Sequence, residues 1–179
     1  MSDVKEVLAQ VHQKYAAHYE NLGRAPVTDY VEEWQAPCYQ GQPEGDQIAW
    51  QAVLQEPPTA FANVEKALEL TLHESIKDFF SHYWAGDLNV RYRDHDVTLL
   101  QVQLPDDAER LQQNLIGHVM MKQRLRQPIT LFIGVGSEDD LILSINNETG
   151  AVGLEYVGKE QHEVLASDLT FFLQRVEPV

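Results

Sequence analysis

The stretch that decides the fold is residues 105–135, PDDAERLQQNLIGHVMMKQRLRQPITLFIGV. Pro105 stands where a helix would begin, because proline is favoured in the first helical turn. Asp106 and Asp107 follow it, and acidic side chains in a first turn stabilise the positive end of the helix dipole. We expect the helix to continue to about Gln127, where a proline follows.

One face of this predicted helix is apolar. The i, i+3, i+4 rule places on one stripe Ala108, Leu111, Leu115, Val119 and Leu125, together with His118. A histidine in such a stripe is usually a hydrogen-bonded core residue, and we favour that interpretation over a catalytic role. The apolar, β-rich segment 129–135 that follows predicts a central strand.

Helix and strand signals continue outward from this stretch in both directions. Helical spacing marks residues 3–22 and 61–84, the second as one helix or as two that meet near Thr71, and Ser167 is expected to cap a last helix. The predicted strands are residues 48–54, 88–92, 97–102, 141–145 and 152–157, with Asp94-His95-Asp96 in the turn of one hairpin. We therefore predict an α+β fold, a single domain over residues 1–179 with a largely antiparallel sheet covered by helices.

The charge of the chain is unusual. Its 179 residues contain 13 Lys and Arg against 28 Asp and Glu, for a net charge of −15. Such a field repels nucleic acids and anionic lipids, and it attracts basic partners. The alternative is that the acidity only maintains solubility.

Several features indicate a cytoplasmic protein. The single cysteine, Cys38, cannot form an internal disulfide and has no basic neighbour to activate it. The first residues lack the basic and apolar regions of a signal peptide, and the longest near-apolar stretch, 129–136, is too short to span a membrane. We expect no direct membrane insertion, so any membrane association would come through a partner.

No motif predicts an enzyme, a cofactor or a metal site. His73-Glu74 begins like the zinc-protease motif, but position 77 is lysine where the second histidine ligand would stand. Gly134-Val135-Gly136 follows a strand but lacks the third glycine of a dinucleotide-binding loop. A metal site at Asp94-His95-Asp96 is disfavoured, because three consecutive turn residues do not easily face one ion.

The acidic residues suggest a binding surface. If the first hairpin and the start of the following helix share an edge, their acids converge there. The candidate partner-binding residues are Asp87, Asp94, Asp106 and Asp107, with Trp84 as an aromatic anchor. The alternatives are core packing for Trp84 and a local helix-dipole role for Asp106 and Asp107.

The deciding stretch also resembles a known family. The run from Gln113 to His118, then Arg124-Leu125, Pro128 and Thr130 to Ile133, is similar to the signature of the Syd family, the SecY-interacting proteins of Gram-negative bacteria. Weaker similarity covers essentially the whole chain, including Ala85-Gly86-Asp87. The residues from Val164 to Leu173 resemble the closing motif of the wider SMI1/KNR4-like superfamily, whose α+β domains serve as binding modules.

The resemblance implies a non-enzymatic protein that binds the cytoplasmic side of the SecY translocon. It would be held peripherally at the inner membrane through SecY, and it would sequester or monitor uncomplexed SecY and so regulate translocation negatively. Cytoplasmic loops of membrane proteins are rich in Lys and Arg, which fits the acidic charge of the chain. The alternative is an immunity-type or scaffold module that binds another basic partner.

Overall fold

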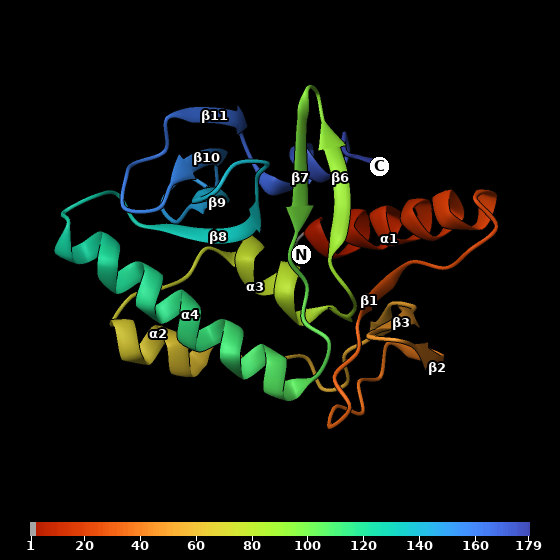
Figure 1. The fold of residues 1–179 in the computed structure, drawn as a ribbon. Helices are drawn as coiled ribbons and strands as arrows, with labels where there is room; N and C mark the ends of the chain where they lie inside the picture. Colours follow the sequence, from red (N-terminus) through yellow and green to blue (C-terminus); the bar gives the residue numbers. More distant parts are fainter. Residues whose placement is uncertain (1–2) are drawn as a thin grey trace.

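A seven-stranded sheet is the framework on which the rest of the chain is arranged (Figure 1). The computed structural model describes residues 3–179. In spatial order the strands are β11 (Glu163–Ala166), β10 (Val152–Tyr156), β9 (Leu141–Asn146), β8 (Thr130–Val135), β7 (His95–Leu99), β6 (Leu88–Tyr92) and β12 (Glu177–Pro178). Every neighbouring pair is antiparallel, which confirms the predicted sheet type.

The sheet bends where β7 meets β8. These strands share two residue pairs, Thr98 with Val135 and Leu99 with Gly134. A Cβ atom on Gly134 would lie 2.6 Å from the carbonyl oxygen of Thr98, so the close approach requires glycine. Figure 1 shows the β6–β7 hairpin standing upright beside β8, β9 and β10 as a result.

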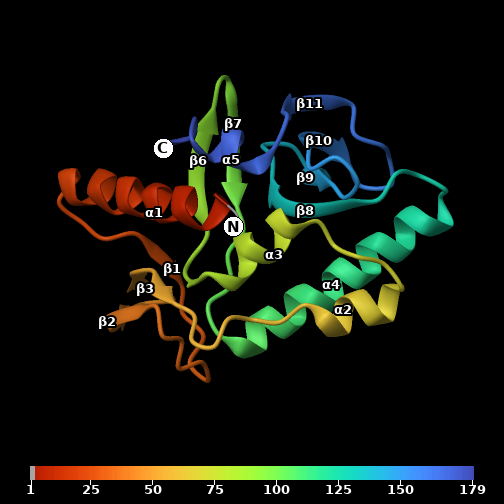
Figure 2. The same cartoon turned by 180° about the vertical axis from the view of Figure 1, so that it is seen from behind.

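The helices cover this bent sheet. The chain between β7 and β8 forms α4 (Pro105–Arg124), which packs against β8 and against α2 (Ala62–Leu68). Helix α1 (Val4–Asn21) packs against α3 (Glu74–Ser81), α5 (Leu169–Leu173) and β12. Figure 2 shows α1 lying across the base of the β6–β7 hairpin. One continuous cluster of buried apolar residues includes side chains from all five helices, which confirms an α+β fold with a single core.

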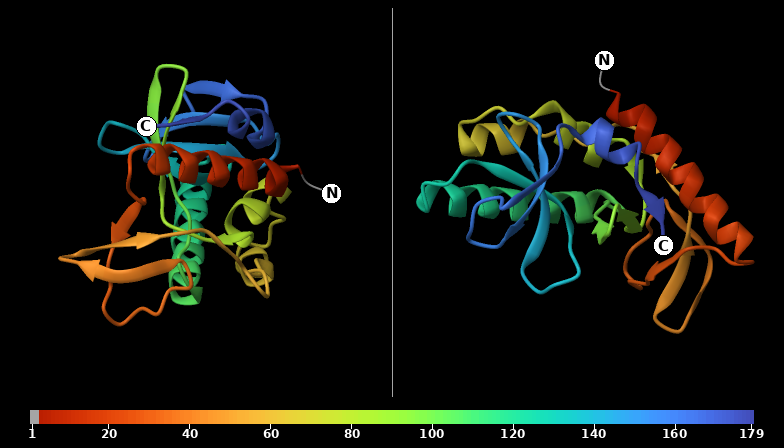
Figure 3. Two further views of the ribbon diagram at one scale, coloured as in Figure 1. Left: turned by 90° about the vertical axis from the view of Figure 1, so that its right-hand side faces the viewer. Right: turned by 90° about the horizontal axis from the view of Figure 1, so that it is seen from above.

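A second, small sheet lies on the other side of α1 (Figure 3, left). It contains β1 (Val27–Asp29), β3 (Gln47–Trp50) and β2 (Tyr39–Glu44), in the order β1-β3-β2. A short ribbon of β4 (Val53–Leu54) and β5 (Tyr83–Trp84) connects this region to the segment that enters β6. Helix α1 is therefore enclosed between the large sheet and the small one.

Several element boundaries differ from the predictions. The predicted strand 48–54 is divided between β3 and β4, which belong to different sheets. The predicted helical segment 61–84 is two helices, α2 and α3, followed by β5. The strands β1, β2, β11 and β12 were not predicted from the sequence, because none of them alternates buried with exposed residues and so none carries a strong periodic signal.

Three capping and turn predictions were wrong in detail. His95 and Asp96 belong to β7, so the hairpin turn is only Arg93-Asp94, and Arg93 adopts the left-handed φ of 55° that this short turn needs. Asp168, not the adjacent serine, caps α5, since its carboxylate accepts from the backbone N–H of Phe171 at 2.7 Å. Helix α4 ends at Arg124, and the next residue, which the stripe had placed in the core, is 47% exposed.

Within residues 3–179, no helix combines the length and apolar character that a membrane span requires.

Candidate partner-binding site

A hollow of about 210 Å³ lies where the start of α4 faces the segments that enter β6 and leave β7. We call it the acidic hollow. It is lined by Trp34, Asp87, Leu100, Gln101, Val102, Gln103, Asp107, Arg110, Leu111, Asn114 and Phe132. These residues come from the loop after β1, from the segment between β5 and β6, from the β7–α4 connection, from α4 itself and from β8. The site therefore depends on the bend in the sheet, which brings β8 and the start of α4 together.

Asp87 is the most perturbed acid of the hollow. Its carboxylate accepts a hydrogen bond from the backbone N–H of Gln101 at 3.0 Å. The side chain is open to solvent, yet protein surrounds it closely enough for desolvation to raise its pKa to about 6. The negative charges of Asp107 and Asp29 add to this shift, and the hydrogen bond from Gln101 opposes it. A carboxylate destabilised in this way gains from an approaching cation.

Asp107 closes the hollow from the first turn of α4. One of its oxygens accepts from the backbone N–H of Gln103 at 2.9 Å, and the other accepts from Arg110 at 2.7 Å. The Asp107 side chain is only 14% exposed, whereas that of Arg110 is 64% exposed and lies over the ring of Trp34. Asp107 thus has a local structural role as well as a position in the hollow.

Gln103 supplies an unsatisfied acceptor. Its Nε2 donates to the hydroxyl of Thr28 at 3.0 Å, which fixes the orientation of the amide. Its Oε1 is buried and, alone among buried side-chain nitrogen and oxygen atoms of the described chain, has no hydrogen-bond partner. A buried acceptor without a partner is costly to the folded state.

The structure brings some of the predicted site residues together and separates others. Asp87 and Asp107 lie together in the hollow, and Asp106 is exposed beside them in the first turn of α4. Trp84 is only 8% exposed and lines a neighbouring hollow with Pro105, so it packs as a wall. Asp94 lies at the tip of the β6–β7 hairpin, at the opposite end from Asp87.

The sequence interpretation missed Trp34, Gln103 and Arg110. A usable signal was present for Gln103, because Gln101 and Gln103 alternate with Val102 at the end of the predicted strand 97–102 and so place two amides on one side. Trp34 is an aromatic among acids in a loop, which gave no indication of its neighbours.

A second group of charges is fully buried under α4. Lys122 donates to Glu155 at 2.7 Å, and neither side chain has any exposed surface. Lys122 also donates to the carbonyl of Lys159 at 2.7 Å, while Glu155 accepts from Thr130 at 3.0 Å and from Ser144 at 2.6 Å. We call Lys122, Thr130, Ser144 and Glu155 the buried polar cluster. It is closed to ligands, so its function is structural.

His118, which was predicted to be a hydrogen-bonded core residue, lies at the edge of the buried polar cluster. Its Nε2 is 3.1 Å from the hydroxyl of Thr130, and its side chain is 7% exposed. Burial lowers its pKa, and the nearby carboxylate of Glu155 opposes that shift. Cys38 is also buried, and burial raises the pKa of its thiol to about 12, which agrees with a packed, unreactive cysteine.

Within residues 3–179, no group of three or more His, Cys, Asp or Glu side chains is arranged to hold a metal ion. The acidic hollow offers the carboxylates of Asp87 and Asp107, the second of them paired with Arg110, and an aromatic wall, which is chemistry for recognition.

The fold and the comparisons with known proteins agree. The antiparallel sheet covered by helices is an α+β domain, and the family match reported next is consistent with the SMI1/KNR4-like superfamily. The model of the family described as Syd protein (SUKH-2) matches residues 5–178. The chain therefore belongs to the Syd family, as the resemblance predicted.

Named relatives support this assignment over most of the chain. A Protein Syd of Idiomarina loihiensis is 47% identical, over 84% of this chain and 83% of that protein. Proteins of the same name from Pseudoalteromonas atlantica and Alteromonas mediterranea are 41% and 42% identical, and each alignment covers at least 97% of both chains.

Proposed function

We propose that this protein binds basic cytoplasmic segments of SecY in the acidic hollow. The observation that carries the site is the concentration of acceptors around Asp87, Asp107 and the unpaired Oε1 of Gln103. The partner is taken from membership of the Syd family, which the sequence resemblance associates with SecY. The net charge of −15 supports a basic partner.

The chemistry of the hollow suits a lysine or arginine side chain. Both carry several N–H donors and no acceptor, so they complement the carboxylate of Asp87. A cation beside Asp87 would favour the ionised carboxylate and reverse the effect of desolvation. Asp106 and Trp84 would form the rim and one wall of the contact.

The cellular consequences belong to the same proposal. A protein bound to cytoplasmic loops of SecY is held peripherally at the inner face of the inner membrane, without inserting into it. Occupied loops are closed to other partners, so binding would sequester uncomplexed SecY and reduce translocation. We propose no enzymatic activity, cofactor or nucleic-acid ligand. One domain, residues 1–179, would carry the whole function.

A second candidate is an immunity-type or scaffold module with another basic partner, since the acidic hollow itself would accept any cationic segment. The test is capture from detergent-solubilised inner membrane on the immobilised protein, followed by detection of SecY. Retention of SecY above an unrelated protein of equal charge supports the proposal. Absence of SecY, with a different basic protein retained, would favour the second candidate.

The site is tested with a matched pair of variants. Asp87→Lys and Asp94→Lys change the net charge equally, but only the first changes the acidic hollow. We expect Asp87→Lys to weaken SecY capture by at least about tenfold, which is 1.4 kcal/mol, and Asp94→Lys to have little effect. The sequence interpretation included Asp94 in the contact, and a loss of capture in Asp94→Lys alone would show that the contact lies at the hairpin tip. Equal losses would show that overall charge, not the hollow, determines binding, and circular dichroism should confirm that both variants fold.

A further inference from the structure

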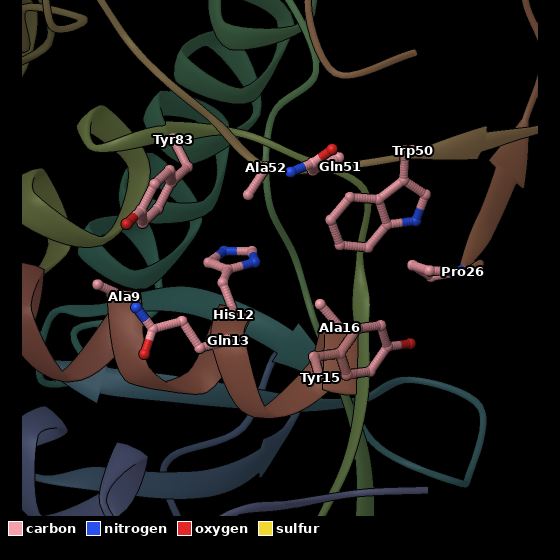
Figure 4. A pocket seen from close by; sticks show the side chains of 10 residues that line it. All are labelled: Ala9, His12, Gln13, Tyr15, Ala16, Pro26, Trp50, Gln51, Ala52 and Tyr83. Carbon is pink, nitrogen blue, oxygen red and sulfur yellow. The ribbon is translucent and has the colours of Figure 1, made fainter. Parts of the chain in front are cut away.

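A pocket of about 200 Å³ lies between α1 and the small sheet, away from the residues that line the acidic hollow (Figure 4). We call it the aromatic pocket. Its principal walls are the rings of Tyr15, Trp50 and Tyr83 and the imidazole of His12. Tyr15 and Trp50 are stacked at 5.9 Å between centroids, and His12 meets Tyr83 edge-on at 4.8 Å. No lysine, arginine, aspartate or glutamate lines it.

The protonation of His12 is fixed by Gln101. The Nε2 of Gln101 donates to the carbonyls of Phe79 and Leu100, at 3.2 and 3.0 Å, so its Oε1 must be the acceptor toward His12. The Nε2 of His12 lies 3.1 Å from that oxygen and therefore carries the proton. Burial lowers the pKa of His12 to about 4, so the ring is neutral at pH 7.

The other ring nitrogen of His12, Nδ1, is then a free acceptor. It has no hydrogen-bond partner among residues 3–179, although the residue is only 7% exposed. It does not belong to the buried unpaired atoms, which among the described residues are Gln103 Oε1 alone, so it is reached from the pocket. Figure 4 shows a ring nitrogen of His12 directed toward the side of the pocket that Trp50 lines.

Size and chemistry together select the ligand. Sites for drug-sized ligands usually hold about 300–1,000 Å³, so this pocket suits a single ring system. A phosphate or carboxylate would find no cation there. A planar aromatic group packs against Tyr15, Trp50 and Tyr83 in offset or edge-to-face contacts, and one N–H or O–H donor would satisfy His12.

We propose that the aromatic pocket binds a neutral indole-type group, whose rings pack against Trp50 and Tyr83 and whose N–H donates to Nδ1 of His12. The group could be a free small molecule or a tryptophan side chain, because both present the same chemistry. This site is independent of the proposed SecY contact. No residue lines both sites, but Gln101, which lines the acidic hollow, connects them, since it contacts His12 through its amide and Asp87 through its backbone N–H.

The test is a titration of the isotope-labelled full chain, followed by two-dimensional NMR, with indole and with benzofuran. Benzofuran has the same shape but an oxygen in place of the N–H. Indole should shift resonances of α1 and β3, and it should bind about fivefold more tightly, the value of one ordinary hydrogen bond. A parallel titration with N-acetyl-tryptophanamide separates the sources. Binding of indole alone assigns a free molecule, and binding of both assigns a side chain.

A matched pair of variants locates the site. Ala16 is exposed and lines the aromatic pocket, whereas the adjacent Ala17 is exposed and does not line it. We expect Ala16→Phe to fill the pocket and abolish the indole shifts, and Ala17→Phe to preserve them. The proposal is overturned if neither indole nor the amide binds, if benzofuran binds as tightly as indole, or if both variants bind as the unmodified chain does.

Discussion

The acidic hollow and the buried polar cluster both contain carboxylates, but the carboxylate of the cluster is enclosed and paired, whereas that of Asp87 in the hollow is open to solvent. In the cluster, the Lys122–Glu155 pair is fully enclosed, and each charge has further hydrogen-bond partners. In the hollow, Asp87 is open to solvent with a raised pKa, and the Oε1 of Gln103 has no partner at all. The first arrangement stabilises packing that is already complete. The second leaves the carboxylate of Asp87 available, with a raised pKa that a bound cation would lower.

The buried polar cluster fixes how α4 lies on the sheet. Lys122 is on the buried face of α4, and Glu155 projects from β10. Because a buried charge is tolerated only with a partner, the helix cannot slide or rotate without leaving Lys122 or Glu155 unpaired. The same helix presents Asp107 at its other end, in the acidic hollow. The cluster therefore positions one wall of the proposed binding site.

The largest effect should follow from removing one member of the buried pair. Glu155→Gln keeps the shape of the side chain but leaves the charge of Lys122 buried and unpaired. We expect the free energy of unfolding to fall by about 3–5 kcal/mol, as measured by urea denaturation.

The control for this variant removes both charges. Lys122→Met combined with Glu155→Gln leaves no unpaired ion, so it should recover much of the lost stability. A loss below about 1 kcal/mol for the single variant would show that the pair is not the restraint described above.

Periodicity in the sequence could predict the helix and its buried face, but not the buried polar cluster. Lys122 follows Val119 by three residues and so lies on the core face. A lysine at that position is nevertheless predicted to be exposed, because nothing in the local sequence indicates a buried partner. Glu155 is on a strand far along the chain, and no local pattern links the two. Long-range partners are decided by tertiary packing, which a single sequence does not encode in its spacing.

The acidic hollow was predicted in part for a related reason. Asp87 lies just before β6, and Asp107 lies shortly after β7. The prediction that they converge therefore required only that β6 and β7 form a hairpin. The same reasoning included Asp94, but the length of the hairpin carries that residue to the far end. Trp34 enters from a loop with no periodic pattern, and its position depends on the small sheet.

A smaller effect distinguishes the acidic hollow from the buried polar cluster, namely how each responds to salt concentration. Raising the ionic strength from about 0.1 M to about 1 M shortens the Debye length from about 10 Å to about 3 Å. Capture of SecY through an accessible acidic hollow should weaken by at least about tenfold, or 1.4 kcal/mol. The pair formed by Lys122 and Glu155 has no exposed surface, so the destabilisation caused by Glu155→Gln should change little over the same range.

Binding measured across the salt series, beside urea denaturation of both proteins, tests this contrast. Capture that does not respond to salt would show that the contact is mainly apolar. A destabilisation by Glu155→Gln that disappears at high salt would show that the cluster is accessible to solvent.

The smallest effect concerns Asp87 itself. Its pKa is about 6 in the folded protein against an ordinary value of 3.8, so the folded state holds the proton more tightly than the unfolded state. The contribution of Asp87 to stability therefore decreases as pH rises from about 4 to about 6, and it stays at the lower level above that range.

Asp87→Asn removes the ionisable group while its amide oxygen can still accept from the N–H of Gln101. We expect the variant to be more stable at pH 7 by at most about 1 kcal/mol, because solvent screens an accessible carboxylate, and unchanged below about pH 4. Urea denaturation at both pH values measures this, with the unmodified chain as the reference. A stabilised Asp87→Asn variant that also captures less SecY would identify Asp87 as a residue kept for binding at the expense of the fold. A variant that loses stability at pH 7 would instead place Asp87 with the structural charges of the buried polar cluster, and the contrast between the two regions would fail.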